Sequence, residues 1–126
     1  MRIEVNKFGI GVDIENIDRF AGSDFVRDSA IVNSIFTQSE QEYCFLYKIA
    51  APHLAARYCA KEAITKALAS IGTNGINYKD IEIINEQAGP PVAVIEKEGV
   101  HDLQVYLSLS HCNDKAVAFA VIIRTI

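Results

Sequence analysis

Hydrophobic and polar residues alternate along residues 8–14, which predicts a strand with two different faces. One face carries four large apolar side chains, and the other carries Gly9, Gly11 and Asp13. Because glycines add no side chain, they leave room for another backbone or a ligand to approach closely. Asp13 is therefore expected near the end of a strand, on the same face as this close approach.

The middle of the chain has helical spacing instead. A long helix is predicted between Pro52, which suits a first helical turn, and Gly72, which suits a C-terminal stop. Its apolar stripe places Glu62 on the opposite side, with Lys66 one turn further along. Two further helices are predicted within residues 16–35, and another begins with a capping box at residues 37–40 and continues to about residue 47. Strands are predicted at residues 81–85, 92–95, 103–110 and 116–123. This order predicts an α+β fold, in which an antiparallel sheet packs with a long helix and shorter helices.

Composition and charge narrow the possible functions. The length of 126 residues suits a single domain spanning residues 1–126, and half of the residues are hydrophobic, so a core can form. The net charge of −4 argues against a nucleic-acid partner. No apolar run is long enough to span a membrane, and no signal peptide is recognisable, so a cytoplasmic location is expected. The three cysteines match no disulfide or zinc pattern, which indicates free thiols.

Two carboxylates in mostly apolar surroundings are the candidates for chemistry. Asp13 lies in a strand, and Glu62 lies on the long helix. Carboxylates that share a hard divalent cation, with cations close by, are typical of a phosphate-handling site. The surrounding polar residues are Arg57, Lys61 and Lys66 on the helix, and Ser110 and His111 at the end of a later strand.

Each of these residues also has a simpler explanation. Asp13 could cap the helix that follows its strand. Glu62 and Lys66 could form an ordinary exposed helix pair. Arg57 and Lys61 could solvate the flank of their helix, and serines or a histidine at a strand end could simply face solvent. Sequence spacing alone does not show that these groups meet.

Two motifs decide between these explanations by resemblance to a family. Gly-Ile-Gly-Val-Asp-Ile-Glu at residues 9–15, followed by Arg19, resembles the opening of the holo-acyl-carrier-protein synthases, the small 4′-phosphopantetheinyl transferases. Ala-Arg-Tyr-Cys-Ala-Lys-Glu-Ala at residues 56–63 is similar to that family's Gly-Arg-Phe-Ala-Ala-Lys-Glu-Ala. Ala56 and Tyr58 depart from the usual Gly and Phe. Further similar blocks follow in the same order at residues 36–40, 80–83, 89–91 and 107–111, so the resemblance covers essentially the whole chain.

The resemblance implies a fold, a reaction and partners. The expected fold is that of the 4′-phosphopantetheinyl transferases. The expected reaction moves the 4′-phosphopantetheine group of coenzyme A to a serine of apo acyl carrier protein, with Mg²⁺, and releases adenosine 3′,5′-bisphosphate. It also implies a homotrimer with active sites between subunits and a place in fatty acid biosynthesis.

The resemblance also assigns roles to residues. Asp13 and Glu62 would bind Mg²⁺ and, with Lys66, form the catalytic set; either Glu62 or a metal-bound water would take the serine proton. Coenzyme A would be bound by Arg57, Lys61, Lys66, Ser110 and His111. The carrier protein would be bound by Arg19, Phe20 and Phe25, although the helix after Asp13 is less basic than is common in the family.

Two other functions fit the same residues. The carboxylates could direct water, rather than a serine, onto coenzyme A or a nucleotide, which would make the protein a hydrolase. Alternatively, the chain could be a non-catalytic module that binds coenzyme A. Turnover of coenzyme A without carrier protein would favour the first, and tight binding without transfer would favour the second.

Overall fold

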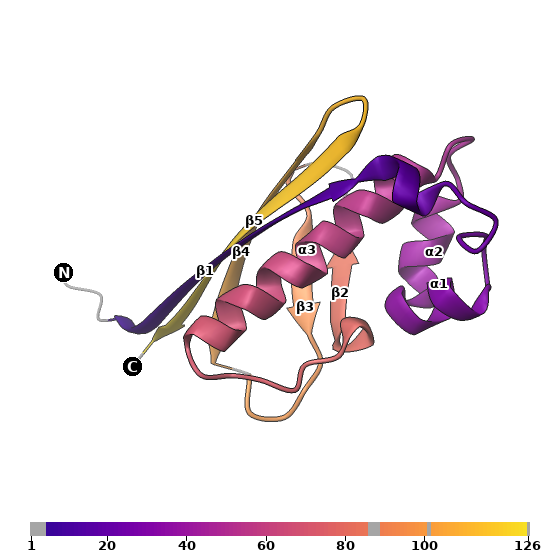
Figure 1. Cartoon of the computed structure of the whole chain (residues 1–126). Coiled ribbons are helices and arrows are strands. Elements are labelled where there is room, and N and C mark those ends of the chain that lie inside the picture. Colours follow the sequence, from indigo (N-terminus) through magenta and orange to yellow (C-terminus); the bar gives the residue numbers. More distant parts are fainter. Residues whose placement is uncertain (1–4, 86–88, 101, 126) are drawn as a thin grey trace.

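The computed structural model describes residues 5–85, 89–100 and 102–125, and its helices and strands form an α+β architecture (Figure 1). A three-stranded antiparallel sheet has the strand order β1-β5-β4, and β2 and β3 form a separate antiparallel pair. The strands are β1 (Val5–Asn16), β2 (Ile81–Ile84), β3 (Val92–Ile95), β4 (Leu103–His111) and β5 (Lys115–Thr125). The helices are α1 (Ala30–Ile35), α2 (Gln38–Cys44) and α3 (Ala51–Ser70), with short 3-10 helices η1 (Ile17–Phe20) and η2 (Tyr78–Asp80).

The long helix α3 packs directly across β1 and β5 (Figure 1). Gly9 and Gly11 make this close approach possible. A Cβ atom on Gly11 would overlap the Ala63 carbonyl oxygen, and one on Gly9 would lie 2.7 Å from the Ser70 Oγ atom. The close backbone approach predicted for this face of β1 is therefore confirmed, and it brings Asp13 to the surface of α3.

The local signals for helix ends are also confirmed. Thr37 and Glu40 form the predicted capping box at the start of α2. Pro52 lies in the first turn of α3, and Gly72 follows its end with a φ of +84°, a conformation that glycine adopts without strain. The two helices predicted within residues 16–35 are shorter than expected: η1 is a 3-10 helix of four residues, and α1 has six.

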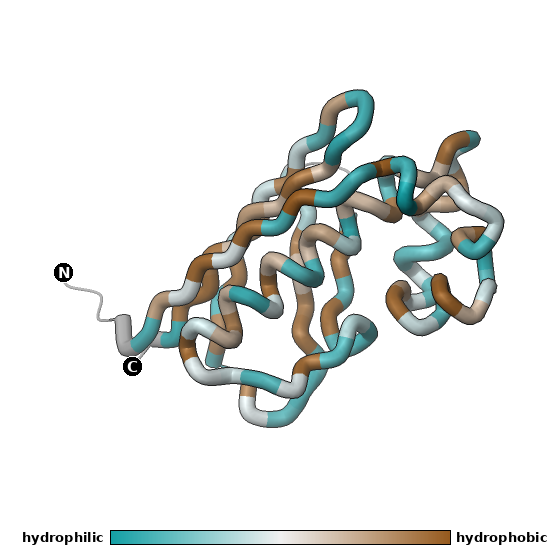
Figure 2. The backbone as a smooth tube through the Cα atoms, in the orientation of Figure 1, coloured by the Kyte–Doolittle hydropathy of each residue, from teal (hydrophilic) through white to brown (hydrophobic). Residues whose placement is uncertain are grey.

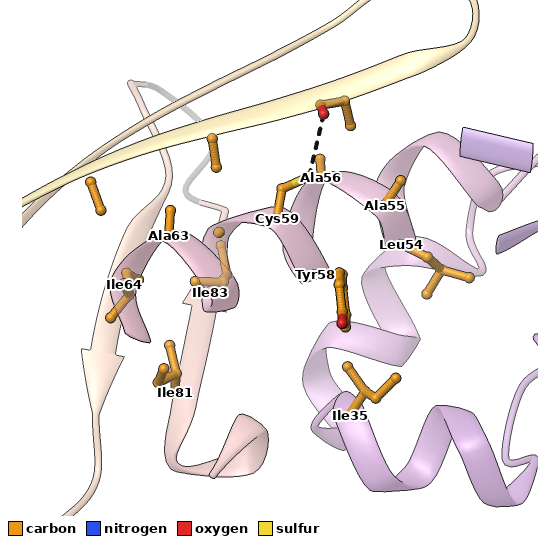
Figure 3. Close-up of a cluster of buried hydrophobic side chains, with 14 of the residues drawn as sticks. Ile35, Leu54, Ala55, Ala56, Tyr58, Cys59, Ala63, Ile64, Ile81 and Ile83 are labelled. Atoms are coloured by element: carbon orange, nitrogen blue, oxygen red, sulfur yellow. Dashed lines mark hydrogen bonds between the residues drawn. The ribbon is translucent and has the colours of Figure 1, made fainter. Parts of the chain in front are cut away.

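The core surrounds α3. Small and apolar residues of this helix pack against the inner face of the sheet, against β2 and against α1 (Figure 3). The Cys59 thiol is buried and donates to the carbonyl oxygen of Ala116 in β5 at 3.4 Å. Strand β5 lies in the middle of its sheet with alanines on the inner face, as its apolar sequence predicts. The helix is buried on nearly every side, rather than along one stripe.

The outer face of the three-stranded sheet carries exposed apolar side chains. The alternation along β1 places Phe8, Ile10, Val12 and Ile14 on this face, and Phe119 of β5 extends it. Figure 2 shows hydrophobic residues recurring along the backbone of these strands. No helix in the described ranges combines the length and apolar character that crossing a bilayer requires.

Candidate active site

Asp13 lies at the end of β1, where the strand passes over α3. Its Oδ1 atom accepts a hydrogen bond from Lys66 Nζ at 3.3 Å, and the same ammonium donates to the Val12 carbonyl oxygen at 3.0 Å. The Oδ2 atom of Asp13 is buried, and no described residue donates to it. Buried polar atoms normally have partners, so this oxygen is available for a ligand.

Glu15 shares the same face of β1 as Asp13. Arg19 donates to Glu15 at 2.8 Å. Burial, followed by the neighbouring Asp13 carboxylate, raises the pKa of Glu15. Glu15 is not among the residues that the sequence predicted for the site, although it lies in the first motif and the two-residue period places it beside Asp13. The two carboxylates concentrate negative charge at the end of β1, which favours a cation there.

Glu62 lies on the same stretch of α3 that Asp13 approaches, because Lys66 follows it by one helical turn. It is half-buried and lines a cavity of about 390 Å³. The other lining residues are Ser34, Thr65, Ile76, Asn77 and Tyr78. The structure therefore places Asp13 in contact with Lys66, one helical turn from Glu62.

The donor set at this position fits Mg²⁺ better than a softer metal. Among residues 5–85, 89–100 and 102–125, no group of three or more histidines, cysteines and carboxylates is placed to enclose a metal ion. Mg²⁺ does not require such a cage, because it commonly uses one or two carboxylates together with water and substrate phosphate. The unpartnered Oδ2 of Asp13 is an oxygen ligand of this type.

A second cavity, of about 240 Å³, lies on another side of α3. Arg57, Ser110 and His111 all line it, so the structure brings together three of the residues predicted to bind coenzyme A. The side chain of Arg57 is only 2% exposed. Its guanidinium donates to the His53 carbonyl oxygen at 3.1 Å and to the side chain of Asn85, and no described residue accepts from its Nε atom.

The charge of this second cavity is positive. Burial, followed by the charges of Arg57 and His111, lowers the pKa of His53, which also lines the cavity. The Arg57 guanidinium lies 4.2 Å from the centre of the Tyr43 ring. A buried guanidinium with a spare N–H donor, beside histidines, suits a phosphate or another anion.

Lys61 is not placed to bind phosphate. Its side chain is 0% exposed, and its ammonium forms a 2.7 Å ion pair with Glu40. The same nitrogen donates to the carbonyl oxygens of Ile35 at 2.8 Å and Tyr78 at 2.9 Å. An ammonium group has three donors, and all three are used here. The expected phosphate contact is therefore corrected to a structural role that ties α3 to α1, α2 and η2.

Two of the three predicted carrier-protein residues remain accessible. Arg19 is exposed, and Phe25 is half-buried. Phe20 is only 1% exposed and packs against Phe25 and Tyr58, with ring centres 5.1 Å and 5.4 Å apart. The prediction of a direct partner contact is wrong for Phe20, which instead supports the surface from below.

The two cavities have no lining residue in common. Arg57 and Glu62 are five residues apart on α3, which is a rotation of about 140° around the helix axis. Within one chain, the residues that resemble a metal site and those that suit an anion therefore face different directions.

Known proteins resemble this chain in both sequence and fold. Residues 9–120 match the model of the 4′-phosphopantetheinyl transferase superfamily. The chain belongs to this superfamily. A holo-[acyl-carrier-protein] synthase of Protochlamydia amoebophila is 39% identical over 116 residues, which cover 90% of this chain and 95% of that protein. One of Geobacter sp. is 38% identical over 123 residues, covering 93% and 98%.

Solved structures of such synthases share the fold of this 4′-phosphopantetheinyl transferase. The acyl carrier protein synthase of Mycobacterium tuberculosis is 30% identical with a TM-score of 0.71, covering 90% of this chain and 95% of that one. A Bacillus anthracis holo-(acyl-carrier-protein) synthase in complex with CoA (3′,5′-ADP) is 29% identical with a TM-score of 0.72, covering 93% and 96%. The predicted family and α+β fold are confirmed, and the transferase is an enzyme of the holo-[acyl-carrier-protein] synthase class.

Proposed function

We propose that this enzyme transfers the 4′-phosphopantetheine group of coenzyme A to a serine of apo acyl carrier protein, with Mg²⁺, and releases adenosine 3′,5′-bisphosphate. The observation that carries this proposal is the contact between Asp13 and Lys66 beside Glu62, with one Asp13 oxygen left without a partner. The names of the similar relatives and the bound coenzyme A in a Bacillus anthracis relative support the choice of substrates.

The reaction exchanges one phosphorus–oxygen bond for another. The serine oxygen of the carrier forms a bond to the phosphorus of the pantetheine phosphate, and the bond from that phosphorus to the bridging oxygen breaks. Adenosine 3′,5′-bisphosphate leaves with the bridging oxygen, and Glu62 accepts the serine proton. Such reactions depend mainly on positioning and on stabilising charge at phosphate oxygens.

The residues of the candidate site contribute to this reaction in different ways. Asp13 and Glu62 would hold Mg²⁺, which neutralises charge on the diphosphate when it is bound. Lys66 offsets further negative charge from one helical turn away. Arg57, Ser110 and His111 bind the phosphates of coenzyme A, with Arg57 offering its spare donor to the 3′-phosphate.

The surface formed by Arg19 and Phe25 is proposed to bind the carrier protein. Acyl carrier proteins are acidic, and this enzyme is acidic overall, so the docking surface needs a local cation. Arg19 is exposed, and its ion pair with Glu15 places it beside the carboxylates at the end of β1. Carrier binding there would bring the serine toward Asp13 and Glu62.

We also propose that the enzyme works as a homotrimer with active sites between subunits. Coenzyme A needs both the carboxylates and the anion cavity, yet the two face different directions within one chain. Phe8 and Ile14 are 60% and 61% exposed on the outer face of the sheet, and Ile10, Val12 and Phe119 widen this apolar surface. Contiguous apolar surface of this kind marks protein interfaces. A neighbouring subunit packed there could bring its anion cavity to the carboxylates.

Residues 1–126 are proposed to act as one domain in the cytoplasm. The three cysteines are all unpaired, which is consistent with a reducing compartment.

Mass spectrometry of apo acyl carrier protein, incubated with this enzyme, coenzyme A and Mg²⁺, tests the reaction. The expected product carries one added phosphopantetheine, and Asp13→Ala and Glu62→Ala should each abolish its formation while remaining folded. Glu42→Ala, which removes an exposed carboxylate on α2, is the matched control and should keep full activity. Full activity of either site variant would exclude its proposed role.

The same samples separate the other functions. Rapid loss of coenzyme A without carrier protein would favour a hydrolase, and tight binding of coenzyme A without any transfer would favour a binding module. Light scattering during size-exclusion chromatography should give three times the 13.9 kDa mass of the chain. A monomer mass in an active sample would exclude sites shared between subunits.

A further inference from the structure

Three aromatic rings gather where α2 is joined to α3. Tyr43 belongs to α2, Tyr47 follows that helix, and His53 lies in the first turn of α3. The Tyr47 and His53 rings stack, with their centres 3.6 Å apart and their planes 19° apart. Tyr43 meets both of them edge to face, with its centre 5.5 Å from that of Tyr47 and 6.0 Å from that of His53. Each ring of this cluster therefore contacts the other two.

The ring cluster lies beside the second cavity, the one of about 240 Å³ that suits an anion. Tyr43 and His53 line this cavity. Tyr47 supports them from the solvent side, where it is exposed, and its hydroxyl oxygen is 3.0 Å from that of Tyr43. None of the three residues has a role in the function proposed above, although two of them reach the proposed coenzyme A site.

The cluster holds the buried guanidinium of Arg57 from two directions. The guanidinium carbon lies over the Tyr43 ring, 4.2 Å from its centre, which is a cation–π contact. One terminal nitrogen donates to the His53 carbonyl oxygen at 3.1 Å, and the other donates to the side chain of Asn85. A guanidinium has five N–H donors, so these contacts fix its position and still leave donors for a ligand.

The groups that hold Arg57 are all uncharged. An aromatic ring, a backbone carbonyl and an amide carry no negative charge, and within the described residues no carboxylate forms an ion pair with Arg57. Arg19 and Arg124 differ, because each pairs with a carboxylate, Glu15 and Asp102 respectively. A carboxylate would cancel the charge of the arginine, whereas a ring holds the guanidinium and leaves its full charge for an anion.

We propose that Tyr43, Tyr47 and His53 form an aromatic clamp that positions the Arg57 guanidinium for the 3′-phosphate of coenzyme A. This inference rests on the proposed function, in which Arg57 binds that phosphate. Tyr43 is the positioning residue in direct contact with Arg57, and Tyr47 acts through Tyr43. The clamp consequently contributes to the choice of coenzyme A over its analogue without the 3′-phosphate.

Removing the Tyr43 ring tests the clamp through the phosphate that it serves. In Tyr43→Leu, the KM for coenzyme A should rise by about 10-fold, in line with the loss of a cation–π contact at a buried site. The kcat for transfer should stay within about threefold of the wild type, because the candidate metal site lies on another side of α3. The KM for 3′-dephospho-coenzyme A should change by less than about twofold, because that substrate lacks the phosphate.

Three further variants make the result specific. Tyr43→Phe keeps the ring and should stay within about threefold of the wild-type KM for coenzyme A. Phe45→Leu is the matched control, since Phe45 is a half-buried aromatic residue at the same end of α2 but lies outside the lining of the anion cavity. The double variant Tyr43→Leu/Arg57→Gln should match Arg57→Gln within about twofold, because Tyr43 acts only through Arg57.

The clamp is excluded if Tyr43→Leu raises the KM for both substrates equally, which would indicate a general structural loss. It is also excluded if Tyr43→Leu behaves like Phe45→Leu, or if the losses from Tyr43→Leu and Arg57→Gln multiply fully in the double variant.

Failure of the proposed function gives a different result, since the wild type itself would then add no phosphopantetheine to the carrier. Isothermal titration calorimetry with adenosine 3′,5′-bisphosphate and with adenosine 5′-phosphate still decides the question without any transfer. The clamp requires that the wild type bind the bisphosphate more tightly, and that Tyr43→Leu weaken the binding of the bisphosphate alone. A wild type that binds both nucleotides equally, or binds neither, would overturn the clamp.

Discussion

Replacing Gly11 by alanine should separate β1 from α3 and disable the site without changing a charged residue. The new Cβ atom would overlap the Ala63 carbonyl oxygen and lie 2.9 Å from the Ala67 backbone nitrogen. Both are backbone atoms of a buried helix, so no flexible side chain can turn aside. Asp13 lies two residues further along the same face, so the displacement would pull it away from Lys66, now 3.3 Å away.

The expected loss of stability is substantial. Overpacking a core costs about 1–3 kcal/mol, and an overlap with rigid backbone belongs at the upper end of that range. For a protein of this size, 1 kcal/mol corresponds to a melting shift of about 4 °C. A cost of about 3 kcal/mol therefore lowers the melting temperature of Gly11→Ala by about 12 °C.

Calorimetry and the transfer assay should be run on the same preparations. At a temperature where Gly11→Ala is still folded, we expect a loss of transfer activity of at least about 10-fold, because misplaced catalytic groups lower rates steeply. Gly22→Ala is the matched control: a Cβ there meets nothing within 4 Å, and Gly22 has no left-handed φ. Wild-type stability and activity in Gly11→Ala would refute the reasoning, and so would an equal loss in Gly22→Ala.

Three further predictions follow from single contacts. Lys61→Met should lower the free energy of unfolding by about 3–5 kcal/mol in a denaturant titration, because it leaves the buried Glu40 charge without a partner. The control, Lys115→Met, removes an exposed ion pair with Asp114 and should cost less than about 1 kcal/mol. Equal losses in the two variants would contradict the buried role of Lys61. Arg19→Glu should raise the KM for carrier protein far more than the KM for coenzyme A in steady-state assays, and equal increases would exclude the docking surface. Burial, followed by the positive charges of Arg57 and His111, lowers the pKa of His53 in the folded protein. The unfolded chain therefore binds a proton at His53 more readily than the folded chain does. The melting temperature should consequently fall as pH decreases through the range where free histidine protonates. His53→Gln should weaken that dependence, and an unchanged slope would contradict it.

Short sequence patterns correctly predicted the features of the fold that depend only on neighbouring residues, such as strand faces and helix ends. The two-residue period placed Asp13 and the glycines on one face of β1, because side chains alternate along any strand. The capping box at Thr37 and Glu40 and the ends of α3 at Pro52 and Gly72 also follow from neighbouring residues alone. These signals need no knowledge of the tertiary structure.

The roles that the sequence misassigned all depend on distant partners. Lys61 is buried because Glu40, on another helix, neutralises it. Phe20 is covered by Tyr58 of α3, a contact that no local pattern predicts. Long-range packing thus decides which side chains reach the site and which only support it.

The buried polar atoms without partners give an independent reason to connect the two cavities. Within the described residues there are three such side-chain atoms: Arg124 Nε, which faces Asp102 in a 3.3 Å ion pair, Asp13 Oδ2 and Arg57 Nε. An unsatisfied buried polar group costs about 1–3 kcal/mol, so a fold keeps such groups where a ligand satisfies them. One of the last two is a carboxylate oxygen that suits a cation, and the other is a guanidinium donor that suits an anion. A substrate with a metal-bound diphosphate and a further phosphate offers a cation to Asp13 Oδ2 and an anion to Arg57 Nε. Such a substrate would satisfy both atoms at once if neighbouring subunits bring the two cavities together.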